Sequence, residues 1–238
     1  MCAFGNKGLR GSDVVKAEKQ RLFAKGYVGQ AAVPPGPPAL NADTPYRPFH
    51  GIDLTMRGDE APTLETERLV LRAHRVEDFP DLAALWSDPV VTRFIFGIPQ
   101  TPEESWSRLL RYAGHWLLLG FGYWAVEEKA TGNFLGEVGF ADMKRAIEPP
   151  LGTTPEAGWV FASWAHGKGF ALEAVQAIHI WGSKNFQTST SACIIHPENE
   201  SSIHLAAKIG YREAARTFYK GTEAIIFFRS WDAERNSN

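Results

Sequence analysis

The chain has 238 residues, a hydrophobic fraction of 44%, a charged fraction of 22% and a formal net charge of −2. This length suits one domain of about 150–200 residues plus a tail, which needs no metal or disulfide to fold. The small net charge excludes a long-range field that would steer the chain onto nucleic acid or an anionic membrane, and no apolar run is long enough for a spanning helix.

Cysteine and histidine usage also argues against a structural metal. Cys2 and Cys193 are the only cysteines, and the seven histidines show no zinc-type spacing. Cys193 lies in an apolar run, so we expect a small buried hydrophobe there rather than a disulfide partner. This usage, and the absence of a secretory signal pattern, favour a cytoplasmic protein.

Residues 1–61 are predicted to form a largely disordered, proline-rich extension. A short amphipathic helix over 12–25 is the one element expected in it, because Ser12 can cap its start. Extended backbone is expected where prolines crowd the chain, at Pro34, Pro35, Pro37, Pro38, Pro45 and Pro48.

The first half of the domain alternates strands and helices. Alternating residues predict a strand over 66–72, and helical spacing predicts a helix over 76–87 that Asp88-Pro89 ends. A second helix starts at Thr101-Pro102 and runs to about residue 118. Strands over 123–127 and 134–140 then form a hairpin.

The second half is predicted to complete a mixed sheet. Helices are expected over 169–184 and 199–209, each following a strand, and a hairpin ends the domain. The order β, α, α, β, β, β, α, β, α, β, β indicates an α/β sandwich. The strands of this half are expected over 156–162, 190–196, 218–219 and 224–228.

The loop between the strand at 156–162 and the following helix contains Gly167 and Gly169. Two glycines one residue apart let the backbone turn tightly and bring N–H groups close to a ligand. The helix adds unpaired N-terminal amides and the positive end of its dipole. The loop therefore predicts a site for an anion, and a phosphate is the first candidate. Its spacing matches neither a P-loop nor a G-x-G-x-x-G loop.

This loop instead resembles that of the GNAT acetyltransferases, R/Q-x-x-G-x-G/A. His166 takes the first position, Gly169 the fourth and Ala171 the sixth. The run from Gly167 to Ala174 is similar to the G-K-G-Y-A-T-E-A of the RimJ/RimL-like branch. His166 departs from the usual arginine or glutamine, which matters little because the family binds the diphosphate mostly through backbone amides.

A second block, residues 199–211, resembles the N-x-x-S-x-x-V-x-x-K-x-G-F of the same branch. The residues of this block that match the pattern would also suit an ordinary helix without a ligand. It is their spacing relative to the glycine loop that favours coenzyme A binding. The opening at 66–72 matches T-E-R-L-x-L-R, so the resemblance covers 64–230. The positions in register in the second block are Asn199, Ser202, Lys208, Gly210 and, for phenylalanine, Tyr211.

The resemblance implies an acetyltransferase domain over 62–232, followed by a tail over 233–238. Its fold would be α/β, with a mixed, mostly antiparallel central sheet flanked by helices and a splayed strand pair that binds acyl-CoA. An N–H near Val160 or Phe161 would point at the thioester oxygen. The implied cofactor-binding residues are Val160, Phe161, His166, Gly167, Lys168, Gly169, Phe170, Ala171, Asn199 and Ser202.

Acetyl transfer to an amine requires that an ammonium of pKa about 8 to 10.4 first lose a proton. Glu156 is the leading candidate base, because related enzymes often carry a glutamate there facing the acceptor, and His196 is the second. Ser202 matches the family's serine near the sulfur, and Tyr211 is a second candidate proton donor to the thiolate. Glu173 lies in the first turn of a helix, where we expect the dipole to stabilise it.

The acceptor stays open among protein N-termini, small amines, amino acids and aminoglycosides. We expect a monomer or homodimer that uses acetyl-CoA as co-substrate, with no metal, nucleic acid or membrane partner. The alternatives are a non-catalytic acyl-CoA-binding module of the same fold and a nucleotide-binding protein of another fold. Aromatic residues expected in the core or around the acceptor are Trp86, Phe94, Phe96, Trp106, Trp116, Phe121 and Trp124.

Overall fold

A computed structural model of the chain describes residues 61–231. The predicted helix over 12–25, the proline-rich stretch and the tail over 233–238 lie outside these residues. Within the described part, every helix falls short of the length and apolar character that a membrane crossing requires.

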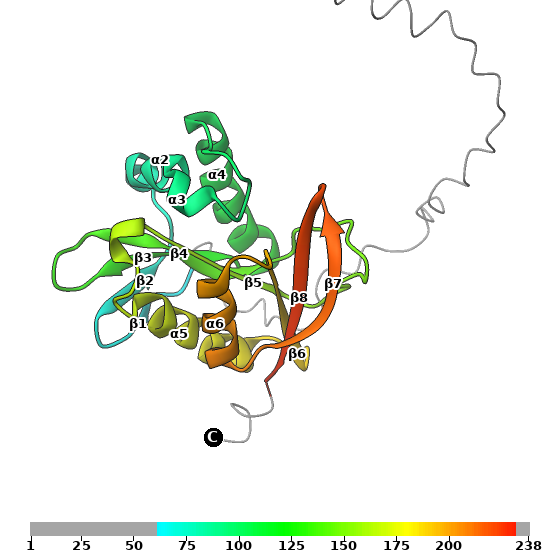
Figure 1. The fold of residues 1–238 in the computed structure, drawn as a ribbon. Helices are drawn as coiled ribbons and strands as arrows, with labels where there is room; N and C mark the ends of the chain where they lie inside the picture. The colour runs from blue at the N-terminus through cyan, green and yellow to red at the C-terminus, as the bar shows by residue number, and fades with distance from the viewer. Residues whose placement is uncertain (1–60, 232–238) are drawn as a thin grey trace, which may run out of the picture. The chain divides into compact units, whose positions relative to one another are not determined.

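An eight-stranded sheet organises the domain, in the order β1-β2-β3-β4-β5-β6-β8-β7 (Figure 1). All neighbours are antiparallel except β5 and β6, which run parallel. This is the mixed, mostly antiparallel sheet that the sequence predicts. The strands are β1 (Leu64–Glu65), β2 (Leu69–Arg72), β3 (Tyr123–Glu128), β4 (Phe134–Ala141), β5 (Glu156–Phe161), β6 (Thr190–Ile195), β7 (Arg212–Tyr219) and β8 (Thr222–Ser230).

The long helices begin and end where local chemistry predicts. Thr101 caps α4 in a reciprocal pair with Glu104, and Gly120 ends the helix in the left-handed region at φ 71°. Asn199 caps α6 through its side chain. The helical elements are η1 (Val76–Asp78), α2 (Phe79–Ser87), α3 (Pro89–Thr92), α4 (Pro102–Leu119), η2 (Ser163–Ala165), α5 (Phe170–Asn185) and α6 (Glu200–Ile209).

Two differences from the predicted elements have clear physical reasons. The last hairpin is longer than predicted, because β7 lies at the sheet edge and alternates exposed and half-buried residues, which hides its strand pattern. The short helix α3 was not predicted. Pro89 starts it and the side chain of Asp88 caps it, so the Asp88-Pro89 pair that ends α2 also begins the next turn.

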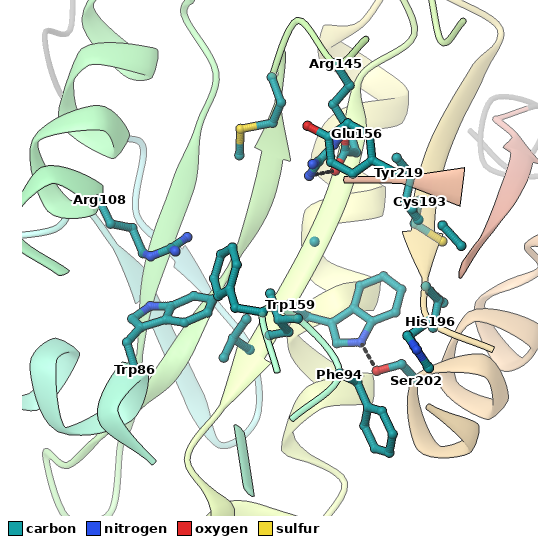
Figure 2. Close-up of a pocket in the computed structure, with 18 of the residues that line it drawn as sticks. Trp86, Phe94, Arg108, Arg145, Glu156, Trp159, Cys193, His196, Ser202 and Tyr219 are labelled. Atoms are coloured by element: carbon teal, nitrogen blue, oxygen red, sulfur yellow. Dashed lines mark hydrogen bonds and ion pairs between the residues drawn. The ribbon is translucent and has the colours of Figure 1, made fainter. Parts of the chain in front are cut away.

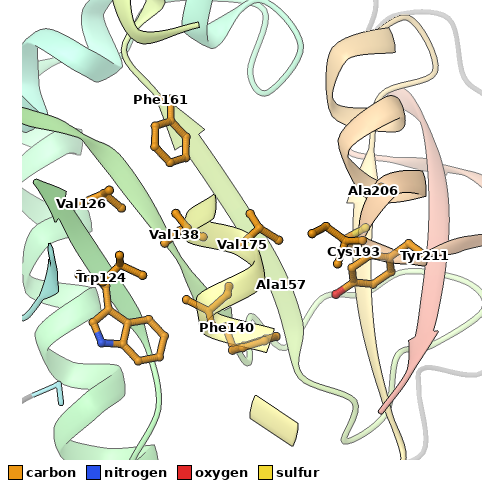
Figure 3. Close-up of a cluster of buried hydrophobic side chains, with 14 of the residues drawn as sticks. Trp124, Val126, Val138, Phe140, Ala157, Phe161, Val175, Cys193, Ala206 and Tyr211 are labelled. Atoms are coloured by element: carbon orange, nitrogen blue, oxygen red, sulfur yellow. The ribbon is translucent and has the colours of Figure 1, made fainter. Parts of the chain in front are cut away.

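Helices cover both faces of the sheet, with α2, α3 and α4 on one side and α5 and α6 on the other (Figure 1). The main core lies between the sheet and α5 and α6. It contains large side chains that are fully buried, among them Ile178, Trp124 and Phe140. Figure 3 shows the last two. Cys193 is buried in this core as a free thiol, as predicted.

Candidate functional site

The strands β5 and β6 separate almost as soon as they meet. They pair only at Glu156 and Ala192, and the Ala192 N–H donates to the Pro155 carbonyl over 3.0 Å. Beyond this point the strands diverge and open into a cleft of about 780 Å³ (Figure 2). Because the ladder stops there, the facing backbone groups of β5 are available to a ligand.

The register of β5 determines which of its amides face this gap. The Ala162 N–H donates to Leu135 on the β4 side over 2.8 Å, and Val160 pairs with Glu137 in β4. Since antiparallel pairs alternate, Val160 directs its backbone groups to β4, whereas Trp159 and Phe161 direct theirs to the gap. The Phe161 carbonyl on that side accepts from Nε2–H of His166 over 2.9 Å, which ties the start of the loop to β5.

The glycine loop that follows presents a row of free amides. Gly167 and Gly169 adopt φ values of 75° and 82°. Within residues 61–231, no protein acceptor takes a hydrogen bond from the amides of residues 167–171. These donors lie at the N-terminus of α5, which favours an anion.

Arg68 braces this loop from the far side. Its guanidinium donates to Glu173 at 2.7 Å and to the Lys168 carbonyl at 3.0 Å, and it lies 4.6 Å from the centre of the Phe170 ring. Burial opposes the charge on Glu173, but hydrogen bonds from Thr66 and Arg68 outweigh it and lower its pKa. Glu173 is therefore held by β1–β2 contacts as well as by the helix dipole.

Glu156 lies at the start of β5 and on the wall of the cleft. Only 8% of the residue is exposed, and both carboxylate oxygens accept from Arg145 at 2.6 Å (Figure 2). Burial lowers the pKa of Arg145, but the hydrogen bond and charge of Glu156 more than compensate and raise it. The pair is a satisfied, bidentate ion pair at one end of the cleft.

His196 also lines the cleft, and its ring lies 5.6 Å from that of Phe94. Its Nδ1 accepts from the Glu198 N–H over 3.1 Å. The neutral imidazole therefore carries its proton on Nε2, so this nitrogen is a donor rather than a base.

Ser202 joins β5 to α6 across the gap. Its hydroxyl accepts from the Trp159 indole N–H over 3.3 Å (Figure 2). Its amide donates to the Asn199 side chain over 3.2 Å. Both Ser202 and Asn199 line the cleft. The structure thus brings Glu156, His196 and Ser202 together in one cavity.

Tyr211 lies elsewhere, behind the sheet and outside the residues that line the cleft. Ser191 donates to its hydroxyl over 2.8 Å, and that hydroxyl donates to Nε2 of His179 over 2.9 Å. Burial raises the pKa of Tyr211. Tyr211 is therefore a core residue whose polar group is satisfied.

The side of the cleft under α4 contains functional candidates that sequence reasoning missed. Arg108 and Tyr112 lie one turn apart on α4, and the Tyr112 hydroxyl donates to the carboxylate of Glu137 on β4. Glu137 is fully buried and lines the cleft. The available signal was a glutamate in the middle of an apolar strand, which requires a partner when buried.

Tyr123 completes this side of the cleft. It stacks on Tyr112 with ring centres 4.6 Å apart, and it faces Gly139, which pairs with Gly158 on β5. A Cβ at residue 158 would collide with the Tyr123 hydroxyl, so the glycine allows this hydroxyl to reach β5. Burial raises its pKa, so the phenol stays protonated at neutral pH.

Aromatic residues divide between core and cleft. Trp116, Phe121 and Trp124 are in the core, and Trp106 lies partly exposed against Phe79. The remaining three line the cleft, and they are Trp86, Phe94 and Phe96.

Comparisons with known proteins agree with this geometry. Residues 68–212 match the acetyltransferase (GNAT) domain model. The uncharacterized protein YkkB of Bacillus subtilis (strain 168) is 34% identical over 164 residues, 66% of this chain and 90% of that protein. A putative GNAT-family acetyltransferase from Bordetella pertussis is 26% identical, with a TM-score of 0.64 over 71% of this chain and 100% of its own. A spermidine N-acetyltransferase from Vibrio cholerae, solved with CoA and spermine, shares the fold at 18% identity, with a TM-score of 0.58 over 72% of this chain and 100% of its own.

Proposed function

The chain belongs to the acetyltransferase (GNAT) family, and we propose that it transfers the acetyl group of acetyl-CoA to a primary amine. The acceptor is either a protein N-terminal α-amine or a small-molecule amine, and it attacks the thioester directly in a ternary complex. One observation carries this proposal: a row of free amides at residues 167–171 follows directly after β5, the strand that separates from β6 beyond Glu156.

The cofactor is proposed to bind along this path. The amides from Gly167 to Ala171 hold the diphosphate, as backbone donors at a helix N-terminus do. The pantetheine arm follows β5, where the N–H groups of Trp159 and Phe161 are its donors, and one of them polarises the thioester carbonyl. Asn199 and Ser202 then lie beside the sulfur. The two sequence blocks support placing the chain in the RimJ/RimL-like branch, and we expect it to act in the cytoplasm.

We assign the proton transfers to groups in the cleft. Glu156 takes the proton of the acceptor ammonium, directly or through a water, and the two hydrogen bonds from Arg145 orient its carboxylate. His196 is less suited, because its basic nitrogen already accepts from Glu198. Ser202 is the proposed donor to the leaving thiolate. Tyr211 has no contact with the cleft and receives no such role.

The test matches two glycines of the same backbone conformation. Gly167 has a φ of 75° and Gly132, in the β3–β4 turn, a φ of 72°, and neither would bring a Cβ within 4 Å of another atom. Valine strains the backbone at both, but only at Gly167 does it obstruct the amide row. We expect Gly167→Val to weaken acetyl-CoA binding at least about 10-fold by calorimetry, and Gly132→Val to leave it unchanged.

A broad amine panel, read by released thiol, tests transfer itself. Turnover by the wild type supports the enzyme. Tight acetyl-CoA binding without turnover on any amine would instead identify a non-catalytic acyl-CoA-binding module. Equal loss of affinity in both glycine variants would contradict the proposed diphosphate site.

A further inference from the structure

We propose that the α4 side of the cleft recognises the ammonium and the carboxylate of an α-amino acid, with Glu137 receiving the ammonium and Arg108 the carboxylate. This rests on the proposed acetyl transfer and names the acceptor class for it.

Glu137 is a buried carboxylate with one oxygen free. Its residue is 0% exposed, and Oε1 accepts from the Tyr112 hydroxyl. Among the described residues, Oε2 has no hydrogen-bond partner. Nε2 of His74 lies 3.8 Å away, within ion-pair range but beyond hydrogen-bond distance, and that buried ring also lacks hydrogen bonds. A buried carboxylate oxygen without a donor is costly, so this position favours a cationic ligand.

Arg108 is a buried cation on the same side of the cleft as the buried carboxylate of Glu137. It is 8% exposed, its guanidinium lies 3.6 Å from the centre of the Trp86 ring and 5.3 Å from that of Phe96, and its Nε has no partner among the described residues. Burial lowers the pKa of Arg108, but the neighbouring Tyr112 hydroxyl and Glu137 carboxylate outweigh this effect and raise the pKa, although no ion pair of Arg108 within 4.0 Å occurs in the described part of the chain. The stacked rings hold the guanidinium in place, as a receptor for a planar carboxylate requires.

The two charges line the same cavity and attract each other, but they form no direct ion pair among the described residues. Glu156 and Arg145, by contrast, satisfy each other fully at its other end. A zwitterion with an ammonium and a carboxylate on one carbon would satisfy Glu137 and Arg108 together. A polyamine would satisfy Glu137 but would leave Arg108 unpaired and repelled.

The position of Glu137 also suits the reaction. It is the cross-strand partner of Val160, which neighbours Trp159 and Phe161, whose amides face the gap. An ammonium held at Glu137 therefore lies beside the part of β5 proposed to bind the thioester. This nitrogen loses a proton through water in the cleft to the carboxylate of Glu156 and attacks the carbonyl carbon. The carbon–sulfur bond then breaks, and the thiolate takes a proton from Ser202, as proposed above.

Pairs of acceptors that differ only by the carboxylate test whether the wild-type protein recognises that group. Phenylalanine is compared with phenethylamine, leucine with isoamylamine and histidine with histamine, so that each pair differs by the carboxylate. We expect kcat/KM to be about 10- to 100-fold higher for the best amino acid than for its decarboxylated partner, the usual effect of a charged hydrogen bond.

Variants then locate the recognition. Arg108→Gln should raise KM for the amino acid about 10- to 100-fold and leave the decarboxylated amine unaffected, removing the preference. Glu137→Gln should raise KM for both. Arg111→Gln is the control, because Arg111 is an exposed arginine of the same helix at the cleft wall. Acetyl-CoA affinity, measured for each variant, confirms that the fold is retained.

Equal use of both members of every pair by the wild type, or equal losses for both in Arg108→Gln, would overturn the proposal. If nothing is acetylated, calorimetry with the CoA-loaded protein decides. Binding of an amino acid but not its decarboxylated partner upholds the receptor and refutes only the transfer. Binding of neither, by a protein that does bind CoA, overturns the receptor.

Discussion

The two faces of the sheet differ in how their buried polar groups are hydrogen-bonded. On the α5 and α6 face, polar atoms form closed chains: Ser191 donates to Tyr211, Tyr211 to His179, and Nδ1–H of His179 to the Val175 carbonyl over 2.7 Å. On the α4 face, Glu137 Oε2 and Arg108 Nε have no hydrogen-bond partner in the described part of the chain, although Nε2 of His74 lies 3.8 Å from Oε2. The first face is nearly satisfied by folding alone, although Trp231 Nε1 lacks a hydrogen-bond partner in the described part of the chain, whereas the second presents a carboxylate and a guanidinium that the proposed ligand would complete.

The strand β5 contributes residues to both the core face and the cleft face. In β5, Ala157, Trp159 and Phe161 contact the main core, although the first two also border the cleft, while Glu156, Gly158 and Val160 line the cleft on the other face. Because strand residues alternate between faces, each chemical residue is flanked by residues that anchor the strand. The comparison predicts that substitutions on one face alter turnover and those on the other alter stability.

The largest expected effect lies on the cleft face. Glu156→Gln removes the proposed base but keeps the shape of the side chain, so kcat should fall about 10²- to 10⁴-fold with little change in acetyl-CoA affinity. Glu223→Gln, at an exposed acid of the same cleft, is the control and should retain turnover. Unchanged turnover in Glu156→Gln would show that another group takes the proton.

Substitutions on the α5 and α6 face should instead change the free energy of unfolding. Phe140 is 0% exposed and packs edge-on against Phe186 and Trp231. Phe140→Ala should lower the free energy of unfolding by about 3–5 kcal/mol in urea titrations, because it leaves a cavity. Phe218→Ala, at an exposed residue, should change it by less than about 0.5 kcal/mol. A loss of turnover at equal folded fraction would contradict the division between the faces.

The closed face also predicts a pH dependence. Burial lowers the pKa of His179 to about 3, against a hydrogen bond to Val175 that raises it. The unfolded chain, with a histidine pKa of about 6.5, then binds the extra proton between these values. The stabilisation is therefore complete above about pH 6.5 and is lost as the pH falls, at up to about 1.4 kcal/mol per pH unit.

Urea titrations between pH 6.5 and 5 measure this effect above the range where carboxylates titrate. His179→Gln cannot take up the proton, so its free energy of unfolding should depend less steeply on pH than that of the wild type. Parallel curves for the two proteins would refute the assignment to His179.

The smallest effect is expected at Ser202. A coenzyme thiol resembles a free thiol of pKa about 8.5, so its thiolate leaves with modest help. Ser202→Ala should lower kcat less than about 10-fold, in the same thiol-release assay. A loss as large as that of Glu156→Gln would make the serine, rather than the glutamate, the main catalytic group of the cleft.

The sequence predicted what local patterns encode. Helix α4 follows from the cap at Thr101 and the stop at Gly120, and the glycine loop from its spacing. Most of the edge strand β7 was not predicted, because a strand at an exposed edge does not need alternating apolar residues. The α4 side of the cleft escaped because Arg108, Tyr123 and Glu137 come from three separate elements, and no spacing along the chain brings them together.

The grip of Arg68 on Glu173, the Lys168 carbonyl and the Phe170 ring has a consequence far from the cleft. A guanidinium that holds the cofactor loop and the β1–β2 turn together couples the mobility of one to that of the other. Occupancy of the loop should then slow amide hydrogen exchange at residues 64–72, making the first hairpin of the domain a reporter of cofactor binding.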